Sequence, residues 1–178
     1  MQLRGVVLVE GVSDRRAVET LARRRGRDLQ AEGVAIVPMG GYGNLPRLLG
    51  QYRDFRLAGL YDVGEERHFL RALGCADRGE LERAGFYACT RDLEDELTQA
   101  VGPDGMERVL AEQGELRAFR TYQKQPAHQA RTLEEQLHGF MWNRKQKYAV
   151  LLVEALDLER VPRPLNRVLA HVSPLEQA

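Results

Sequence analysis

Two carboxylates, Glu10 and Asp14, come directly after an apolar run, Val6 to Val9, near the start of the chain. Gly11 between them permits a tight turn, and Ser13 can cap a helix that opens with Asp14. If the run is a buried strand, both acidic side chains lie at its carboxyl end, the edge at which open α/β sheets build their sites. A charge there is costly without a partner, and a divalent metal ion is one such partner. The alternative is a solvated loop carboxylate beside an ordinary helix cap.

Acidic residues recur at the ends of two further apolar runs. Asp62 follows the run Arg56–Tyr61, and Asp92 and Glu94 follow the run Gly85–Cys89. The helix macrodipole alone explains acidic residues in a first helical turn, but it does not explain why three of four strand ends are acidic. Three such clusters at one sheet edge could hold one or two Mg²⁺ or Mn²⁺ ions through oxygen ligands. Two such ions can activate water and stabilise the leaving oxygen in phosphodiester cleavage.

The elements that must position these residues are four short apolar runs separated by helical patterns. None of the runs alternates polar with apolar residues, which is typical of strands buried on both faces. The β-α-β-α-β-α-β order predicts an α/β fold with a mainly parallel four-stranded sheet and right-handed crossovers. Asn44 is expected to cap the second helix, after a tight turn at Gly40–Gly43. The runs are Gly5–Val9, Val34–Pro38, Arg56–Tyr61 and Gly85–Cys89.

After about residue 100 the pattern becomes helical, with prolines between the segments and no further strand. We therefore predict a core at residues 1–101 and a helical C-terminal extension at residues 102–178 that packs on the core. The helices of this extension are predicted at Met106–Gln113, Thr132–Phe140, Lys145–Leu156 and Pro164–Val172.

The composition argues against several classes of protein. Lys plus Arg and Asp plus Glu number 26 each, so no bulk positive charge indicates a nucleic-acid binder. Cys75 and Cys89 lack the spacing of metal ligands or of a disulfide scaffold. No apolar run approaches transmembrane length and no signal peptide precedes the first strand, which predicts a cytoplasmic protein without a membrane partner. The four histidines lack metal-site spacing and are expected to be structural or exposed: His68, His128, His138 and His171.

The order of these motifs resembles a TOPRIM domain, the metal-binding fold shared by topoisomerases, primases and several nucleases. The resemblance rests on Val7-Leu-Val-Glu10-Gly-Val-Ser-Asp14, on Val37-Pro-Met-Gly-Gly-Tyr-Gly-Asn44, on a strand-end aspartate, and on Asp92-Leu-Glu94. It covers roughly residues 4 to 100. The glycine-asparagine segment and the Asp-Leu-Glu-Asp-Glu-Leu run are similar to the branch found in overcoming-lysogenisation-defect (OLD) nucleases, which implies a TOPRIM-like (Rossmann-like) fold.

The resemblance implies roles for individual residues. Glu10 and Asp14 would be metal ligands, with Glu10 also a general acid/base. Asp62 would match the first aspartate of an Asp-x-Asp pair whose second position is Gly64 here. Glu65 or Glu66 could reach the same ion from the following turn; Glu66 is the preferred one. Asp92 and Glu94 would match the later acidic position.

A lysine near the end of the TOPRIM region of OLD-type nucleases is thought to stabilise developing phosphate charge. Lys145 is the preferred match and Lys147 the alternative, while a solvated helix start explains both equally well. The implied function is Mg²⁺- or Mn²⁺-dependent hydrolysis of phosphodiester bonds, with DNA favoured over RNA. OLD nucleases generally join this domain to an ATPase, so a separate ATPase partner or a homodimer is expected.

Two other functions remain open at this stage. Gly64 and the neutral net charge are consistent with a catalytically degenerate TOPRIM-like module that binds nucleic acid or protein. A TOPRIM ribonuclease acting on structured RNA has a similar size, but the Asp-Leu-Glu-Asp-Glu-Leu run favours the OLD-like interpretation.

Overall fold

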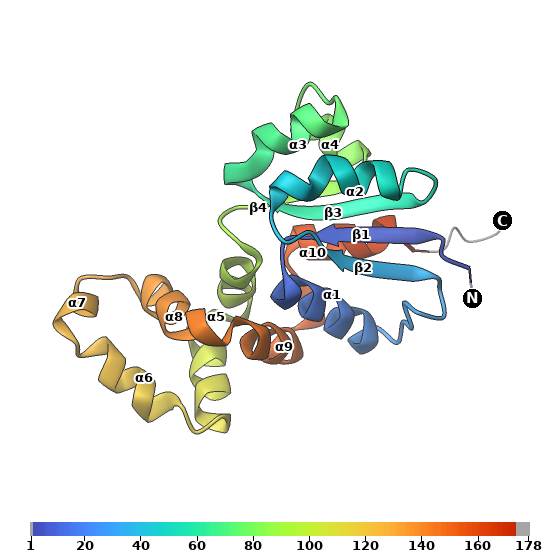
Figure 1. Cartoon of the computed structure of the whole chain (residues 1–178). Helices are drawn as coiled ribbons and strands as arrows, with labels where there is room; N and C mark the ends of the chain where they lie inside the picture. The colour runs from blue at the N-terminus through green and yellow to red at the C-terminus, as the bar shows by residue number, and fades with distance from the viewer. Residues whose placement is uncertain (1, 174–178) are drawn as a thin grey trace.

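A four-stranded parallel sheet forms the centre of the protein in the computed structural model, which describes residues 2–173 (Figure 1). The strand order is β2-β1-β3-β4, so β1 and β3 are the inner strands. Val7 of β1 lies opposite Ile36 of β2 and Ala58 of β3. The four predicted strands are confirmed to within one residue at each end: β1 Gly5–Val9, β2 Val34–Pro38, β3 Arg56–Asp62 and β4 Phe86–Cys89.

Burial on both faces explains why β1 is a continuous apolar run. Every residue from Gly5 to Val9 is buried. Val6 and Leu8 pack with one hydrophobic cluster, and Val7 and Val9 pack with another on the opposite face. Since successive side chains of a strand point to opposite faces, a strand covered on both sides needs an apolar residue at every position.

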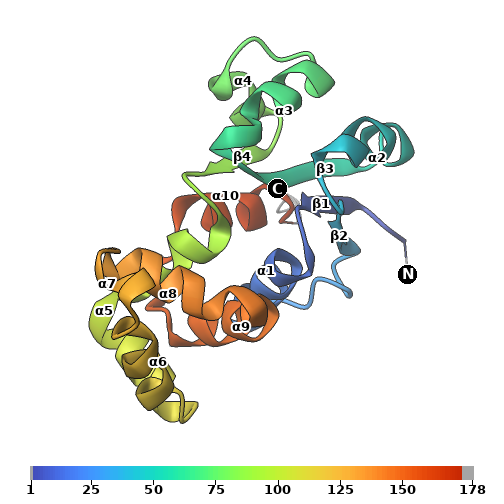
Figure 2. The same cartoon turned by 60° about the vertical axis from the view of Figure 1, so that its left-hand side comes forward.

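Helices cover both faces of the sheet and complete a three-layer α/β fold (Figure 2). The cluster containing Val6 and Leu8 is covered by α2, α3 and α4, and the cluster containing Val7 and Val9 by α1 and α10. Helix α4 and the short helices α6 and α7 were not expected, because they are too short to show a clear apolar period. The helices around the sheet are α1 Val12–Arg24, α2 Leu45–Gln51, α3 Glu66–Leu73, α4 Arg78–Arg83 and α10 Arg163–His171.

The chain leaves the sheet after β4 and returns to it at the end. Helix α5 kinks at Gly102 (φ 73°, ψ 168°), directly before Pro103, so the predicted boundary at residue 101 falls at a kink within one helix. Helices α6 to α8 extend away from the sheet (Figure 1), while α9 packs on α1. The remaining helices are α5 Leu93–Glu112, α6 Leu116–Gln123, α7 Pro126–Gln129, α8 Leu133–Met141 and α9 Lys145–Ala155, and the 3₁₀ turns are η1 Tyr42–Asn44, η2 Val63–Glu65, η3 Trp142–Arg144 and η4 Leu158–Arg160.

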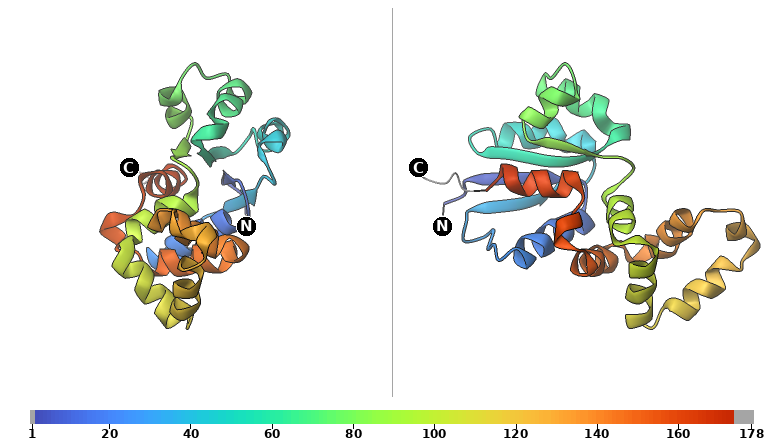
Figure 3. Two further views of the ribbon diagram at one scale, coloured as in Figure 1. Left: turned by 90° about the vertical axis from the view of Figure 1, so that its left-hand side faces the viewer. Right: turned by 180° about the vertical axis from the view of Figure 1, so that it is seen from behind.

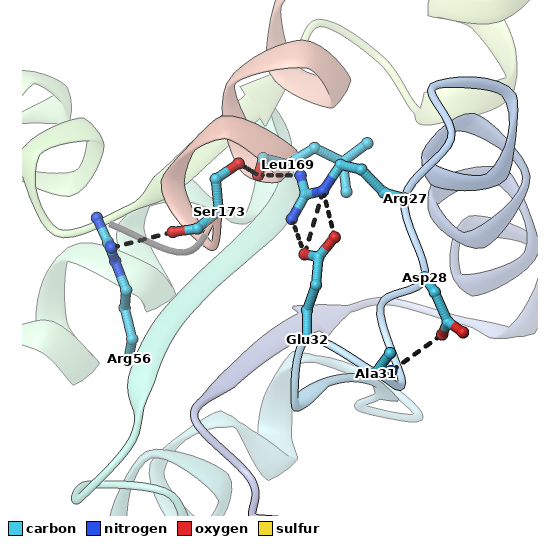
Figure 4. Close-up of polar contacts among 7 residues, drawn as sticks. All are labelled: Arg27, Asp28, Ala31, Glu32, Arg56, Leu169 and Ser173. Atoms are coloured by element: carbon cyan, nitrogen blue, oxygen red, sulfur yellow. Dashed lines mark hydrogen bonds and ion pairs between the residues drawn. The ribbon is translucent and has the colours of Figure 1, made fainter. Parts of the chain in front are cut away.

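The last helix, α10, covers one face of the sheet. It packs on β3 and β4, and the view from behind in Figure 3 shows it lying over the sheet. Arg27 Nη1 donates to the carbonyl oxygen of Leu169 at 2.8 Å, and the same guanidinium is paired with Glu32 (Figure 4). Arg56 Nη1 also donates to the carbonyl of Ser173, at 3.4 Å. The Arg27 contact pairs a carbonyl in the last turn of α10, where the helix itself offers no partner, and the Arg56 contact ties down the residue that follows the helix. Residues 163–173 therefore belong to the same packed core as residues 5–89.

Within residues 2–173, none of the helices combines the length with the apolar character that crossing a bilayer requires.

Candidate metal and phosphodiester site

A cavity of about 660 Å³ lies at the carboxyl edge of the sheet, where all four strands end. Because the strands are parallel, the segments that follow them meet at this edge. Of the predicted site residues, only Glu66 does not line the cavity. Its lining consists of Glu10, Gly11, Ser13, Asp14, Gly40, Gly41, Asp62, Asp92, Leu93, Glu94, Trp142 and Lys145.

The turn after β1 holds Asp14 in a way that differs from the prediction. Helix α1 begins at Val12 with Gly11 as its N-cap residue, so Ser13 lies inside the first turn and is not the cap. The carboxylate of Asp14 instead accepts a hydrogen bond from the backbone N–H of Gly11 at 2.8 Å. Only 9% of Asp14 is exposed. The turn therefore places a nearly buried carboxylate beside Glu10 at the end of the inner strand β1.

The turn after β2 contributes two glycines, and so no bulky side chain, to the lining of the cavity. Gly40 and Gly41 have φ of 68° and 109°, a region that side chains other than glycine rarely adopt. Asn44 is the N-cap residue of α2, as predicted, but its side chain makes no capping bond; its Nδ2 donates to the carbonyl of Met39 at 2.8 Å and so closes the loop. The glycines therefore shape the cavity wall with backbone alone.

Burial, reinforced by repulsion among the carboxylates, raises the pKa of two acidic groups in the cavity. Burial, together with the charges of Glu94 and Glu10, raises the pKa of Asp14 from 3.8 to about 7, against the Gly11 hydrogen bond and Lys145. Burial and the charges of Glu10, Asp92 and Asp14 raise the pKa of Asp62 to about 8. The cavity thus concentrates more negative charge than its own residues neutralise.

Glu94 and Lys145 both line the cavity and form an ion pair. Glu94 lies in the first turn of α5 and is 5% exposed, and its Oε1 atom is buried without a hydrogen-bond partner. Its Oε2 atom lies 3.6 Å from Lys145 Nζ, an ion pair longer than a hydrogen bond. Lys147, the alternative lysine, is instead bound to Glu115 Oε1 at 2.8 Å. The structure therefore brings Lys145, and not Lys147, to the carboxylates.

Asp92 is held by two partners from the protein. Its Oδ1 atom accepts from the backbone N–H of Asp95 at 2.8 Å and so caps α5. Its Oδ2 atom lies 2.7 Å from His138 Nε2, on α8. His138 was expected to be structural or exposed, and no spacing in the sequence links it to Asp92, 46 residues away. Asp92 thus has less free acceptor capacity than Glu10, Asp62 or Glu94.

The predicted ligand Glu66 lies elsewhere. Its Oε2 atom accepts hydrogen bonds from Arg78 Nε at 2.6 Å and from the Tyr61 hydroxyl at 3.2 Å, and it is not part of the cavity lining. Glu65 also lies outside the lining, with its carboxylate 3.7 Å from His68 Nε2. A side chain at Gly64 would meet nothing within 4 Å. Neither glutamate occupies the place of the second aspartate.

The donor set fits a divalent cation by its chemistry. Carboxylate oxygens are the ligands that Mg²⁺ and Mn²⁺ prefer, and the Oε1 atom of Glu94 is buried without a hydrogen-bond partner. A cation bound here would favour the ionised forms of Asp14 and Asp62, whose pKa values burial and the neighbouring carboxylates raise. No group of three or more His, Cys, Asp or Glu side chains within residues 2–173 is already arranged around a common ion position. An ion would therefore have to draw these side chains closer together.

The parallel sheet flanked by helices is an α/β fold of the TOPRIM-like kind, and comparison with known proteins agrees. Residues 3–59 match the family model "Overcoming lysogenization defect protein-like, TOPRIM domain". The C-terminal region of the Burkholderia pseudomallei OLD protein has a similar structure, with a TM-score of 0.74 and 18% identity, over 97% of this chain and 98% of that one. The C-terminal region of the Xanthomonas campestris pv. campestris OLD protein gives a TM-score of 0.72 and 22% identity, over 96% and 94% of the two chains.

Residues 3–59 therefore resemble the TOPRIM domain of OLD-like proteins, and the fold of the chain resembles the C-terminal region of OLD proteins, as its motifs predicted. At identities of 18% and 22% the likeness to the solved structures establishes the shared fold. It extends over almost the whole chain and so includes the helical segments after β4. A search of the curated proteins found no match.

Proposed function

We propose that this protein is a metal-dependent nuclease of the OLD-like TOPRIM type that hydrolyses phosphodiester bonds, with DNA favoured over RNA. One observation carries the proposal: carboxylates that follow three different strands, together with one lysine, line a single cavity. The match of residues 3–59 to the OLD-like TOPRIM family supports a nuclease-type domain.

Glu10, Asp14, Asp62 and Glu94 would hold one or two Mg²⁺ or Mn²⁺ ions. Bound there, such ions would supply Lewis-acid stabilisation and a water of lowered pKa. Glu10 lies at the end of the inner strand, lines the cavity and is exposed, so it can exchange a proton with solvent or substrate. Asp92 would support the site indirectly by fixing the start of α5, which carries Glu94.

Lys145 provides the positive charge that a phosphate needs beside these carboxylates. Its Nζ atom lies 3.6 Å from Glu94 and 4.3 Å from the centre of the Trp142 ring, and 28% of its side chain is exposed. A lysine held at a cavity wall can stabilise charge on a non-bridging phosphate oxygen as it develops.

Cleavage assays with plasmid and single-stranded DNA test the proposal, in Mn²⁺, in Mg²⁺ and in a chelator. We expect cleavage only with an ion, and a loss of roughly 100-fold or more in rate for Glu10→Gln. Lys145→Ala should also lose activity, while the matched variant Lys147→Ala should stay close to the unmodified protein. Circular dichroism confirms the fold of each variant. Ion-dependent cleavage that survives Glu10→Gln would overturn the assigned role of Glu10.

A catalytically degenerate TOPRIM-like binding module is the second candidate function. Gly64, the distant position of Glu66 and the lack of a preassembled ligand set within residues 2–173 favour it. Calorimetric titration with Mg²⁺ and with Mn²⁺ separates the candidates, because a degenerate module should bind neither ion at millimolar concentration. Incubation with structured RNA in parallel with DNA tests the ribonuclease alternative.

A further inference from the structure

Each of the exposed large hydrophobic side chains of residues 2–173 belongs to a residue that lines the carboxylate cavity or directly follows one. They are Val12 (44% exposed), Tyr42 (43%), Val63 (36%) and Trp142 (57%). Trp142 lines the cavity, and the other three directly follow the lining residues Gly11, Gly41 and Asp62. We call these four side chains the apolar rim. Scattered exposed apolar residues need no explanation, but a set that gathers on the segments lining one cavity is typical of a binding surface.

Both aromatic members of the apolar rim are held by a neighbour. The Tyr42 ring stacks on His68, with centroids 4.1 Å apart and planes 23° apart. Lys145 Nζ lies over the Trp142 ring at 4.3 Å from its centre. Each ring nevertheless remains 43% or more exposed. The protein therefore presents two oriented aromatic surfaces to solvent, which lowers the entropy lost when a flat ligand stacks on them.

The two rings come from different sides of the sheet. Tyr42 lies in the turn before α2, which covers one face, and Trp142 lies in the turn before α9, which packs on α1 at the other face. Figure 1 shows α2 and α9 on opposite sides of β1. Trp142 lines the cavity and Tyr42 directly follows the lining residue Gly41, so the two aromatic positions come to the cavity from opposite sides of the sheet.

The charged cavity and the apolar rim together indicate a ligand that combines a phosphate with flat apolar groups. A phosphodiester entering the cavity would meet carboxylates, their ion and Lys145, while the groups on either side of it would meet aromatic and aliphatic carbon. Unpaired nucleobases fit this arrangement, because every base has a π-face that stacks on aromatic side chains. Bases in a duplex are already stacked on each other and cannot offer that face.

We propose that the apolar rim stacks on the unpaired bases beside the scissile phosphate, so that the substrate class is single-stranded nucleic acid. The inference rests on the proposed nuclease function and specifies its substrate. The neutral formal charge of the chain supports it, because a protein with balanced charge gains little from the general attraction to phosphates. Stacking must then supply a large share of the affinity.

Trp142 is the single tryptophan of the chain, so its fluorescence reports directly on the rim. We would titrate the Glu10→Gln protein of residues 1–178, which should cleave too slowly to interfere, with short single-stranded oligonucleotides in Mg²⁺ and in a chelator. Controls are the same oligonucleotides with abasic residues beside the central phosphate, and the matching duplex. We expect quenching by the single strand and much less by either control. Deoxy- and ribo-oligonucleotides identify which strand is preferred.

Anisotropy of labelled oligonucleotides measures the contribution of each ring. Trp142→Ala and Tyr42→Ala should each weaken binding of the single strand by roughly 5- to 150-fold, whereas Trp142→Phe keeps a π-face and should lose less. The affinity of the abasic strand should change little in all three variants. Trp142 and Tyr42 are exposed, so circular dichroism should be unchanged.

Several results would overturn the inference: equal affinity for abasic and intact strands, equal affinity for duplex, or unchanged binding by Trp142→Ala. A blue shift of the emission with rising protein concentration would show that a second copy covers the rim, and would also overturn it. The cleavage assay is independent of these measurements. Ion-dependent cleavage without base-dependent binding refutes the inference alone, and base-dependent quenching without any cleavage refutes the nuclease function alone.

Discussion

Removing one negative charge from the cavity should stabilise the metal-free protein at neutral and alkaline pH. Asp14→Asn is the sharpest such change, because the asparagine side-chain oxygen can still accept the hydrogen bond from Gly11. The folded protein keeps a proton on Asp14 up to about pH 7, whereas the unfolded chain releases it near pH 3.8. The free energy of unfolding of the unmodified protein therefore falls as the pH rises from 4 to 7, and Asp14→Asn does not share that loss.

The size of the effect follows from the pKa of Asp14. The rise from 3.8 to about 7 corresponds to an upper limit of about 4 kcal/mol at pH 8, at about 1.4 kcal/mol per unit. At pH 5 the same reasoning leaves about 1.6 kcal/mol, so most of the advantage should develop between pH 5 and pH 7. For a chain of 178 residues, each kcal/mol shifts the melting temperature by roughly 2–4 °C.

Urea denaturation in chelator at pH 5 and pH 8 measures this difference. The matched control is Asp77→Asn, since Asp77 is also a helix-start carboxylate that accepts a backbone hydrogen bond, from Glu80, but it is exposed and outside the cavity. We expect little change for the control at either pH. Millimolar Mn²⁺ at pH 8 should stabilise the unmodified protein more than Asp14→Asn. An Asp14→Asn protein that is less stable than the unmodified one at pH 8 would refute the reasoning.

Two further predictions concern the fold. Gly85→Ala should destabilise the protein by roughly 2–4 kcal/mol, because φ is 93° and a Cβ there would lie 2.6 Å from His171 Nε2 and 2.8 Å from a backbone oxygen. The control is Gly50→Ala, inside α2 with open space around it, which should raise the free energy of unfolding by about 0.5–1 kcal/mol. Equal effects of the two substitutions in thermal melts would contradict this contrast. Tyr148→Phe should lower the free energy of unfolding by about 1–3 kcal/mol, because the hydroxyl of this buried residue donates to Glu115 at 2.5 Å. The midpoint of urea denaturation measures the loss, and an unchanged midpoint would show that the bond adds no stability.

Local patterns in the sequence determined the strands and the acidic edge of the sheet. The runs at 5–9, 34–38, 56–61 and 85–89 are apolar at successive positions because both faces of the sheet are covered. The carboxylates that end these runs had to meet, because the carboxyl ends of parallel strands lie at one edge. Burial and strand direction are properties of short segments, so the sequence was sufficient for both.

The details of the site required the tertiary structure. The sequence favoured Lys145 and kept Lys147 as the alternative, and the packing of α9 on α1 and α5 brings Lys145 to Glu94 and Lys147 to Glu115. Likewise, the contact between His138 and Asp92 joins residues 46 positions apart, and no local pattern encodes it.

Competition between partners decided the remaining differences. Glu66 was expected at the metal because it lies close in sequence to Gly64, yet Arg78 and the Tyr61 hydroxyl bind its carboxylate away from the cavity. Ser13 was expected to cap α1, yet Gly11 is the N-cap residue there. Asn44 is the N-cap residue of α2 as expected, but its side chain bonds to the Met39 carbonyl and not to the helix. The sequence by itself determined where acidic groups gather, because that depends on strand burial and direction. The tertiary structure decided which of them face the cavity, because each side chain turns toward the partner that packing places nearest to it.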